Sequence, residues 1–307
     1  MTKFIIIKKN LLFLNILKFL IVFSLLLISF LFLFERKSIM TFSSNNENLL
    51  YDFDGDGSDE SVEILKEKNK YLISVNNSKS KYILTDSNDS KYLGDFTKKW
   101  PLKLDLIDLS RDNIPEIIVR TSIDNQPINY VFSWNGKDFS NILTTTDNIL
   151  GILDSNNNRS LKLFTLSSRK GDSSSKSYMF LGDEVKDITF ANLKVPSLSY
   201  IQKFIDIIEA PYNLEETPNI FSINIPKDEF SKLWHLNKDS YRYSFQNGYF
   251  IDTNWNSSLS PSKLTWLLSF DVINYKDDSI LPKELLIYVS VSEDNYKELK
   301  ISSIKFN

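Results

Sequence analysis

The first forty residues are dominated by a nearly unbroken hydrophobic run from Leu11 to Phe34, which only four polar residues interrupt. About 20 apolar residues are enough for a helix to cross the hydrocarbon core of a membrane. Lysines precede the run and little net charge follows it, so we expect a cytoplasmic N-terminus. Because Ser29 to Met40 offers no small-residue cleavage site, an uncleaved anchor is favoured over a signal peptide. The pattern predicts a cytoplasmic tail (1–10), a transmembrane helix (11–34) and a linker (35–48).

The hydrophobic pattern changes after the linker. Over residues 49–190, short alternating segments rich in β-branched and aromatic residues are separated by clusters of Asn, Asp, Gly and Ser. Such spacing is typical of strands and turns. Asn135-Gly136 lies between two of these segments and is a strong hairpin signal. We therefore expect a mainly β domain over 49–190.

Helical spacing begins after Pro196, where the apolar positions are Ile201, Phe204, Ile205 and Ile208. Pro211 then ends the helix, and a second short helix is expected from Lys227 to Leu236. Strand-like segments occupy the rest of the chain, and Asn247-Gly248 is predicted to form a turn between two of them. Helices followed by antiparallel strands predict an α+β domain over 191–307.

Composition narrows the chemistry. The 307 residues include no cysteine and a single histidine, His235. Disulfides, thiolate metal sites and cysteine nucleophiles are therefore excluded, and no histidine pair is available for a transition metal. A lone histidine beside apolar residues is more often a packing or surface residue than a catalytic base. Outside residues 1–37 the chain has 30 basic and 38 acidic residues, which argues against nucleic acid and fits a cation ligand.

An internal repeat recurs in the β-rich part. Three aspartate-rich segments each follow two apolar residues and begin at positions 52, 108 and 154, so that the offsets are 56 and 46 residues. The segments are Asp52–Glu60, Asp108–Glu116 and Asp154–Lys162. Recurrence of one segment at similar intervals along the chain indicates a repeat architecture.

The first copy has the chemistry of a calcium loop, and Gly57 permits the sharp turn that lets its carboxylates converge. No basic residue lies between Asp52 and Glu63, so the carboxylates would repel one another without a cation. Magnesium fits less well, because it prefers a smaller octahedral shell. We predict a structural Ca²⁺ site whose ligands are Asp52, Asp54, Asp56, Ser58 (through its carbonyl oxygen) and Glu60.

Two alternatives to this interpretation remain open. The segment could be a solvated acidic turn that binds no ion. It could also be an EF-hand, because Glu63 occupies the twelfth position of the EF-hand loop pattern. The residues before Asp52 are poor helix formers, which disfavours the EF-hand.

The later copies retain fewer ligands. Ser110 replaces a carboxylate in the second copy and Arg111 adds a positive charge. The third copy has Lys162 at the closing position, so we expect it to keep the turn and to bind no ion. The weaker ligand set of the second copy is Asp108, Asp112 and Glu116.

The first loop, its later copies and the segment Trp134–Phe139 resemble the FG-GAP/VCBS repeats of bacterial surface proteins and integrin-type β-propellers. This resemblance covers 49–190 and implies a calcium-stiffened scaffold. A closed propeller needs about four or more blades, and only three units are present, so the resemblance implies a propeller-like domain that can be incomplete. Residues 197–307, which end in Tyr296–Ile304, resemble the nuclear transport factor 2-like fold. That resemblance implies an antiparallel curved sheet around a pocket.

These features predict a single-pass plasma-membrane protein whose bulk is extracytoplasmic. The high Lys and Asn content, two alanines and no cysteine fit a Gram-positive cell surface. The predicted role is non-catalytic binding or scaffolding, with the membrane and a protein or polysaccharide as partners and without nucleic acid. Two other roles remain open: an extracytoplasmic enzyme that uses a pocket in the C-terminal domain, and a component of an envelope assembly.

Overall fold

The computed structural model describes residues 49–78, 80–154, 160–168, 175–182, 184–213, 216–277 and 282–307, the backbone of 40–43, and residues 18, 20, 23 and 24. The chain divides into two compact units, Met1–Ile39 and Met40–Asn307. In the described part of the chain, no helix combines the length and the hydrophobicity that crossing a membrane requires.

This finding corrects the predicted N-terminal anchor. Most of Leu11–Phe34 lies outside the described residues, and the few described positions there form no helix that could span a membrane. The membrane as a partner and the plasma-membrane location were both predicted from that anchor helix. Without it, neither prediction is supported.

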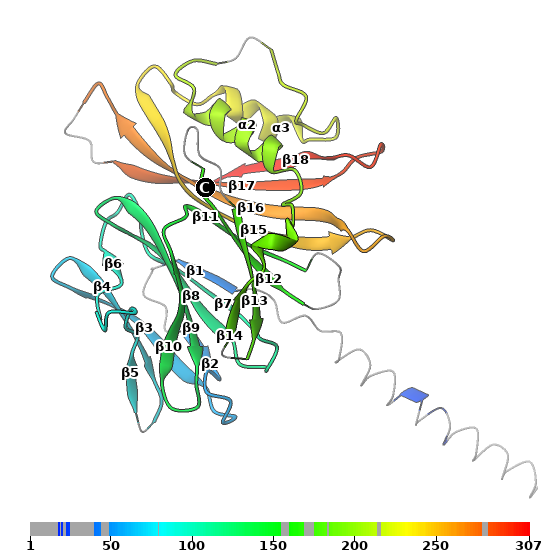
Figure 1. Cartoon of the computed structure of the whole chain (residues 1–307). Coiled ribbons are helices and arrows are strands. Elements are labelled where there is room, and N and C mark those ends of the chain that lie inside the picture. The colour runs from blue at the N-terminus through cyan, green and yellow to red at the C-terminus, as the bar shows by residue number, and fades with distance from the viewer. Residues whose placement is uncertain are drawn as a thin grey trace, which may run out of the picture. The chain divides into compact units, whose positions relative to one another are not determined.

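The described strands of the second unit form three β-sheets (Figure 1). Sheet B has the strand order β2 (Leu49–Tyr51), β3 (Glu60–Glu67), β4 (Lys70–Asn76) and β5 (Lys81–Ile83), and β6 (Gly94–Asp95) also pairs with β4. Sheet A has the order β1 (Met40–Ser43), β7 (Lys103–Ile107), β8 (Glu116–Ile123), β9 (Gln126–Trp134) and β10 (Phe139–Thr145). Alternating apolar side chains of these two sheets share one hydrophobic cluster.

Sheet C is the largest sheet and has eight strands. Its order is β14 (Glu184–Asp187), β13 (Ser175–Leu181), β12 (Lys162–Leu166), β11 (Ile149–Leu153), β15 (Tyr241–Trp255), β16 (Pro261–Asn274), β17 (Lys283–Glu293) and β18 (Leu299–Phe306). Between β14 and β15 the chain forms the helices η1 (Thr189–Ala191), α2 (Leu198–Glu209) and α3 (Lys227–Trp234). Residues of both α-helices pack in the hydrophobic cluster of sheet C.

Three antiparallel meanders follow one another along the chain: β2–β5, β7–β10 and β11–β14. Each carries one aspartate-rich segment between its first and second strands. β3 and β4 begin at residues 60 and 70, and β8 and β9 begin at 116 and 126, which is 56 residues later in both cases. β11 and β12 begin at 149 and 162, which is 46 residues after β7 and β8 at 103 and 116. The structure thus places the three segments at equivalent positions.

Sheets A and B stack in the same orientation instead of facing each other symmetrically. Val62 of sheet B and Val119 of sheet A belong to the cluster between the two sheets. The residue equivalent to Val62 at the 56-residue offset is Ile118, which alternates with Val119 along β8 and therefore lies on the opposite face. Sheet A consequently packs one face on sheet B and turns the other toward sheet C, as the middle unit of a linear repeat array does.

Helix α2 covers one end of this array, where Phe204 and Ile208 share a cluster with Ile149 and Phe164 of the third meander. The outer face of sheet B forms the other end. Several apolar positions of sheet A are replaced there, at the 56-residue offset, by Ser61 (Ile117), Glu63 (Val119), Ser74 (Tyr130) and Asn76 (Phe132). The same face also carries Leu50, Leu65, Leu72 and Ile83, so it is only partly polar.

The predicted fold class is therefore wrong in its architecture. The described residues contain no helix that could cross a membrane, and their strands form no propeller. Sheet C takes strands from both sides of residue 191, so the last part of the chain is not an α+β domain with a sheet of its own. It is also mixed, because β11 and β15 pair in parallel from Ile149 with Gly248 to Ile152 with Ile251. The long connection through the helices makes this parallel pairing sterically accessible.

The turn predicted at Asn247-Gly248 is also wrong. These residues lie within the 15-residue strand β15, at a bulge between Phe245 and Asn247. The Gly248 N–H donates to the carbonyl oxygen of Asn148, at 2.9 Å. Pairing with β11 and β16 on its two sides holds this Asn-Gly pair in the sheet, where an isolated sequence would turn.

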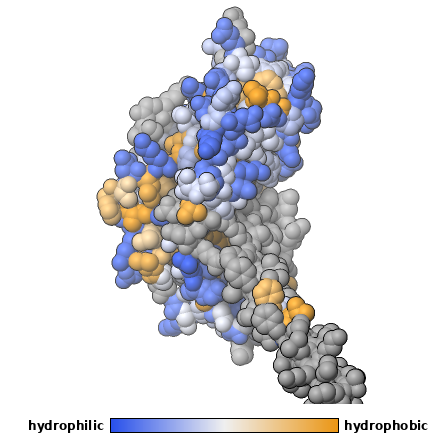
Figure 2. Space-filling view, turned by 90° about the vertical axis from the view of Figure 1, so that its right-hand side faces the viewer, coloured by the Kyte–Doolittle hydropathy of each residue, from blue (hydrophilic) through white to orange (hydrophobic). Residues whose placement is uncertain are grey.

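The surface is largely hydrophilic on the face that Figure 2 shows, with hydrophobic residues in separate groups. The most exposed large hydrophobic side chains are Phe190 (87%), Ile223 (83%) and Tyr296 (82%), which belong to three different segments. Isolated hydrophobic side chains of this kind are ordinary on a protein surface. Leu50, Leu65 and Ile83 are also exposed, and they share the outer face of sheet B.

Candidate metal centre

The first aspartate-rich segment is a tight loop organised by Asp52, which follows β2. One carboxylate oxygen of Asp52 accepts the N–H of Gly55 at 2.7 Å, and the other accepts the N–H of Gly57 at 3.2 Å. Both glycines have positive φ, at 76° and 88°, a conformation that glycine adopts without steric penalty. The loop therefore turns around the Asp52 carboxylate.

Glu60 closes the loop from the first position of β3. Its side chain is buried, at 1% exposure, and Oε2 accepts the backbone N–H of Phe53 at 2.8 Å. Phe53 is itself fully buried in the cluster between sheets A and B, and this burial fixes the loop to the sandwich. The other oxygen, Glu60 Oε1, is buried and has no hydrogen-bond partner among the described residues.

Three carboxylates converge at this point. One oxygen from each of Asp52, Asp54 and Glu60 lies within 4.8 Å of the others. Burial raises the pKa of Glu60, and the negative charges of Asp54 and Asp56 raise it further, against the lowering effects of the backbone N–H groups of Phe53 and Asp54. Without a positive charge nearby, the group is electrostatically unfavourable.

This arrangement fits a calcium ion. Ca²⁺ takes about six to eight oxygen ligands in flexible geometry, including carboxylates and water. The unpartnered Glu60 Oε1 is the kind of buried acceptor that a cation would satisfy, since leaving it unpaired costs about 1–3 kcal/mol. Asp52, Asp54 and Glu60 would hold the ion, which would remove the repulsion between them.

The structure brings together only part of the predicted ligand set. Asp56 lies outside the converging group, and its Oδ1 accepts the backbone N–H of Ser58 at 2.8 Å. These two residues shape the end of the loop. The EF-hand alternative is wrong, because the strands β2 and β3 flank the loop and Glu63 on β3 forms an ion pair with Lys81 at 3.6 Å.

The second loop repeats the backbone geometry of the first. The two carboxylate oxygens of Asp108 accept the N–H groups of Arg111 at 2.6 Å and Asn113 at 3.1 Å. Arg111 and Asn113 have positive φ, as Gly55 and Gly57 do at the equivalent positions. Glu116 Oε2 accepts the N–H of Leu109 at 2.6 Å, as Glu60 does with Phe53.

The second loop lacks the convergence of carboxylates. In the described part of the chain, Asp108, Asp112 and Glu116 form no group like that of the first loop, because Ser110 occupies the position of Asp54. Burial raises the pKa of Glu116 to about 7. The second loop therefore has the same turn as the first. In place of three converging carboxylates it has one buried carboxyl group, Glu116, whose raised pKa favours the protonated form.

Most of the third segment, residues 155–159, lies outside the described residues. At its ends, the Asp154 N–H donates to Asp252 at 2.9 Å and Lys162 donates to the carbonyl oxygen of Ser160 at 3.3 Å. His235 follows α3, and its Nδ1 lies 2.7 Å from the carbonyl oxygen of Ser231 in the same helix. This contact places His235 outside the metal centre.

The chain matches no known family model and no curated protein. The candidate site therefore depends on its own geometry. Sequence reasoning identified Asp52, Asp54 and Glu60, but it gave no sign that Glu60 would be buried with one oxygen unpartnered. The nearest signal in the sequence is the alternation of apolar residues along β3, because Glu60 lies in phase with Val62 and Ile64.

Proposed function

We propose that the chain is a non-catalytic scaffold built from β-repeats, and that its first repeat is stiffened by a structural calcium ion. The observation that carries the proposal is the buried, unpartnered Glu60 Oε1 beside Asp52 and Asp54. A scaffold role is supported by the array itself, in which sheets A and B stack on one hydrophobic cluster and the helices cover the third meander.

A structural role for the ion follows from its place in the fold. Asp52 and Glu60 also accept backbone N–H groups that shape the loop, so an ion held by them would lock the β2–β3 hairpin. The loop also touches its neighbour, because a Cβ added at Gly55 would lie 2.9 Å from Ile114 Cδ1. Rigidity imposed on the first loop would therefore extend to the second meander.

Calcium is expected to raise the melting temperature of the full chain. At a free concentration 100-fold above its dissociation constant, it would add about 2.7 kcal/mol to the free energy of unfolding. This corresponds to a shift of roughly 5 to 10 °C for a unit of this size. Thermal melts in calcium and in chelator would measure the shift, and Glu60→Gln should abolish it.

The chain offers a matched control in Glu116→Gln. Glu116 is buried and accepts a backbone N–H just as Glu60 does, but it lacks neighbouring carboxylates that converge with it. This variant should keep the full calcium-dependent shift. Equal melting temperatures of the wild-type chain in calcium and in chelator would refute the proposal.

A further inference from the structure

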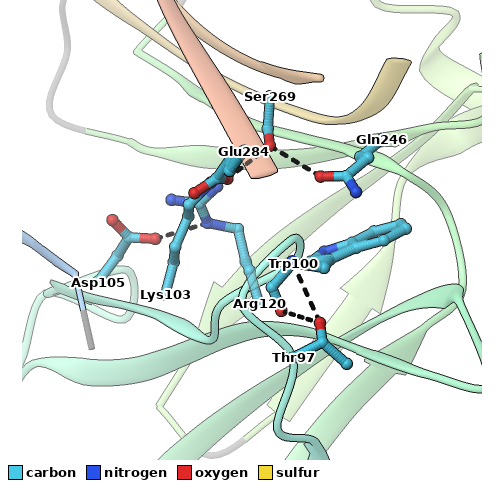
Figure 3. Close-up of polar contacts among 8 residues, drawn as sticks. All are labelled: Thr97, Trp100, Lys103, Asp105, Arg120, Gln246, Ser269 and Glu284. Carbon is cyan, nitrogen blue, oxygen red and sulfur yellow. Dashed lines mark hydrogen bonds and ion pairs between the residues drawn. The ribbon is translucent and has the colours of Figure 1, made fainter. Parts of the chain in front are cut away.

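A group of charged and polar side chains is buried between sheets A and C, and we call this group the ionic seam. Figure 3 shows side chains from β7 and β8 of sheet A pointing toward residues of β16 and β17. The residues of the seam are Lys103, Asp105, Arg120, Tyr249, Ser269 and Glu284.

Ion pairs connect the two sides of the seam. Lys103 Nζ donates to Glu284 Oε1 across the interface, and this carboxylate oxygen also accepts the hydroxyl of Ser269 at 2.5 Å. Within sheet A, Arg120 Nε donates to Asp105 Oδ2 at 2.8 Å. The guanidinium carbon of Arg120 lies 4.4 Å from the ring centre of Tyr249, on β15. The seam therefore contains buried charges, whereas the clusters on either side of it are apolar. The same face of sheet A also buries the apolar side chains Ile118 and Val131.

The closed seam leaves several polar atoms unsatisfied. Asp105 Oδ1, both terminal nitrogens of Arg120 and the hydroxyl of Tyr249 are buried without hydrogen-bond partners among the described residues. Each such group costs about 1–3 kcal/mol relative to its hydrated state. Burial also lowers the pKa of Lys103, which shows that its charge is unfavourably desolvated. Admission of water would relieve these penalties.

The topology allows the seam to open without loss of either hydrophobic cluster. All strands of sheets A and B lie between residues 40 and 145, and all strands of sheet C lie between 149 and 306. The two hydrophobic clusters divide in the same place. The chain crosses once, through residues 146–148, where Asp147 is bonded to Thr165 of sheet C at 2.6 Å. No pairing of backbone strands joins sheet A to sheet C among the described residues.

We propose that the ionic seam is an opening plane, along which residues 40–145 and 149–307 separate and hydrate while each hydrophobic cluster stays closed. Opening breaks the Lys103–Glu284 ion pair, hydrates the Asp105–Arg120 pair and several unpaired polar atoms, and exposes apolar side chains such as Ile118 and Val131. It breaks no β-ladder. This motion is independent of the proposed calcium site, which lies within the first half.

Single cysteine substitutions test the proposal without background, because the chain contains no cysteine. Val131 and Val119 form a matched pair in sheet A, with exposures of 1% and 0%. Val119 belongs to the cluster between sheets A and B, whereas Val131 lies on the face toward sheet C. Val131→Cys should react with a thiol reagent at least about 100-fold faster than Val119→Cys in the full chain, because only its face is exposed by opening.

A second variant separates opening of the seam from a local defect at residue 131. In the combined variant Asp105→Leu and Arg120→Met, opening hydrates fewer buried charges, because only Lys103 and Glu284 stay charged in the seam. Labelling of Val131→Cys should therefore slow at least tenfold, or by about 1.4 kcal/mol. Equal labelling rates of the two cysteines would overturn the proposal, whether both are slow or both are fast. Unchanged labelling in the combined variant would overturn it as well.

Discussion

Replacement of Asp105 alone by alanine is expected to lower the free energy of unfolding by about 3–5 kcal/mol, because it leaves the charge of Arg120 buried without its partner. Asp105 is fully buried and Arg120 is 4% exposed. Their contact at 2.8 Å is the only ion pair of Arg120 among the described residues. Denaturant titration of the wild-type chain and the variant would measure the loss.

The control for this prediction is removal of both charges. Asp105→Leu together with Arg120→Met should cost far less than the single substitution, and it can even stabilise, because replacement of a buried pair by apolar residues is often neutral or favourable. A double variant as unstable as Asp105→Ala would show that the pair matters through its shape and packing. The electrostatic explanation of the seam would then be wrong.

Glu116→Gln is expected to stabilise the chain at neutral pH and above, but not at acidic pH. Burial raises the pKa of Glu116 from 4.5 to about 7 in the folded state. A folded state that binds the proton more tightly loses stability as the pH rises from the unfolded pKa to the folded pKa. Glutamine mimics the protonated side chain and can still accept the N–H of Leu109.

The gain from Glu116→Gln should therefore be near zero at pH 4 and reach about 3 kcal/mol by pH 8, at 1.36 kcal/mol per unit of pKa difference. Urea titrations of both proteins at the two pH values would measure it. Other groups contribute equally to both proteins and cancel in the difference. A gain that is the same at pH 4 and pH 8 would contradict the protonation of Glu116.

The local pattern of the sequence predicted the helices and the repeat offsets well. The helix expected between Pro196 and Pro211 and the one expected from Lys227 to Leu236 correspond to α2 (Leu198–Glu209) and α3 (Lys227–Trp234). The offsets of 56 and 46 residues between aspartate-rich segments recur as offsets between strands. These features depend on residues that are near one another in sequence, which a pattern can report.

The pairing of distant segments could not be predicted in this way. Lys103 and Glu284 are 181 residues apart, and neither side chain carries a local sign that it will be buried. The parallel pairing of β11 with β15 is also non-local, and it overrides the local turn preference of Asn247-Gly248. The same holds for Glu60, whose burial depends on sheet A covering Phe53. The aspartate-rich loop was therefore predictable as a motif, but the unpartnered oxygen on which the calcium proposal rests was not.

The most direct test of the calcium proposal is a crystal structure of the full chain grown in millimolar calcium. We expect an ion within the β2–β3 loop, bound by oxygens of Asp52, Asp54 and Glu60 at about 2.3–2.6 Å. Glu60 Oε1 should be among its ligands. A well-ordered loop with no ion, and with Glu60 Oε1 still unpartnered, would contradict the proposal.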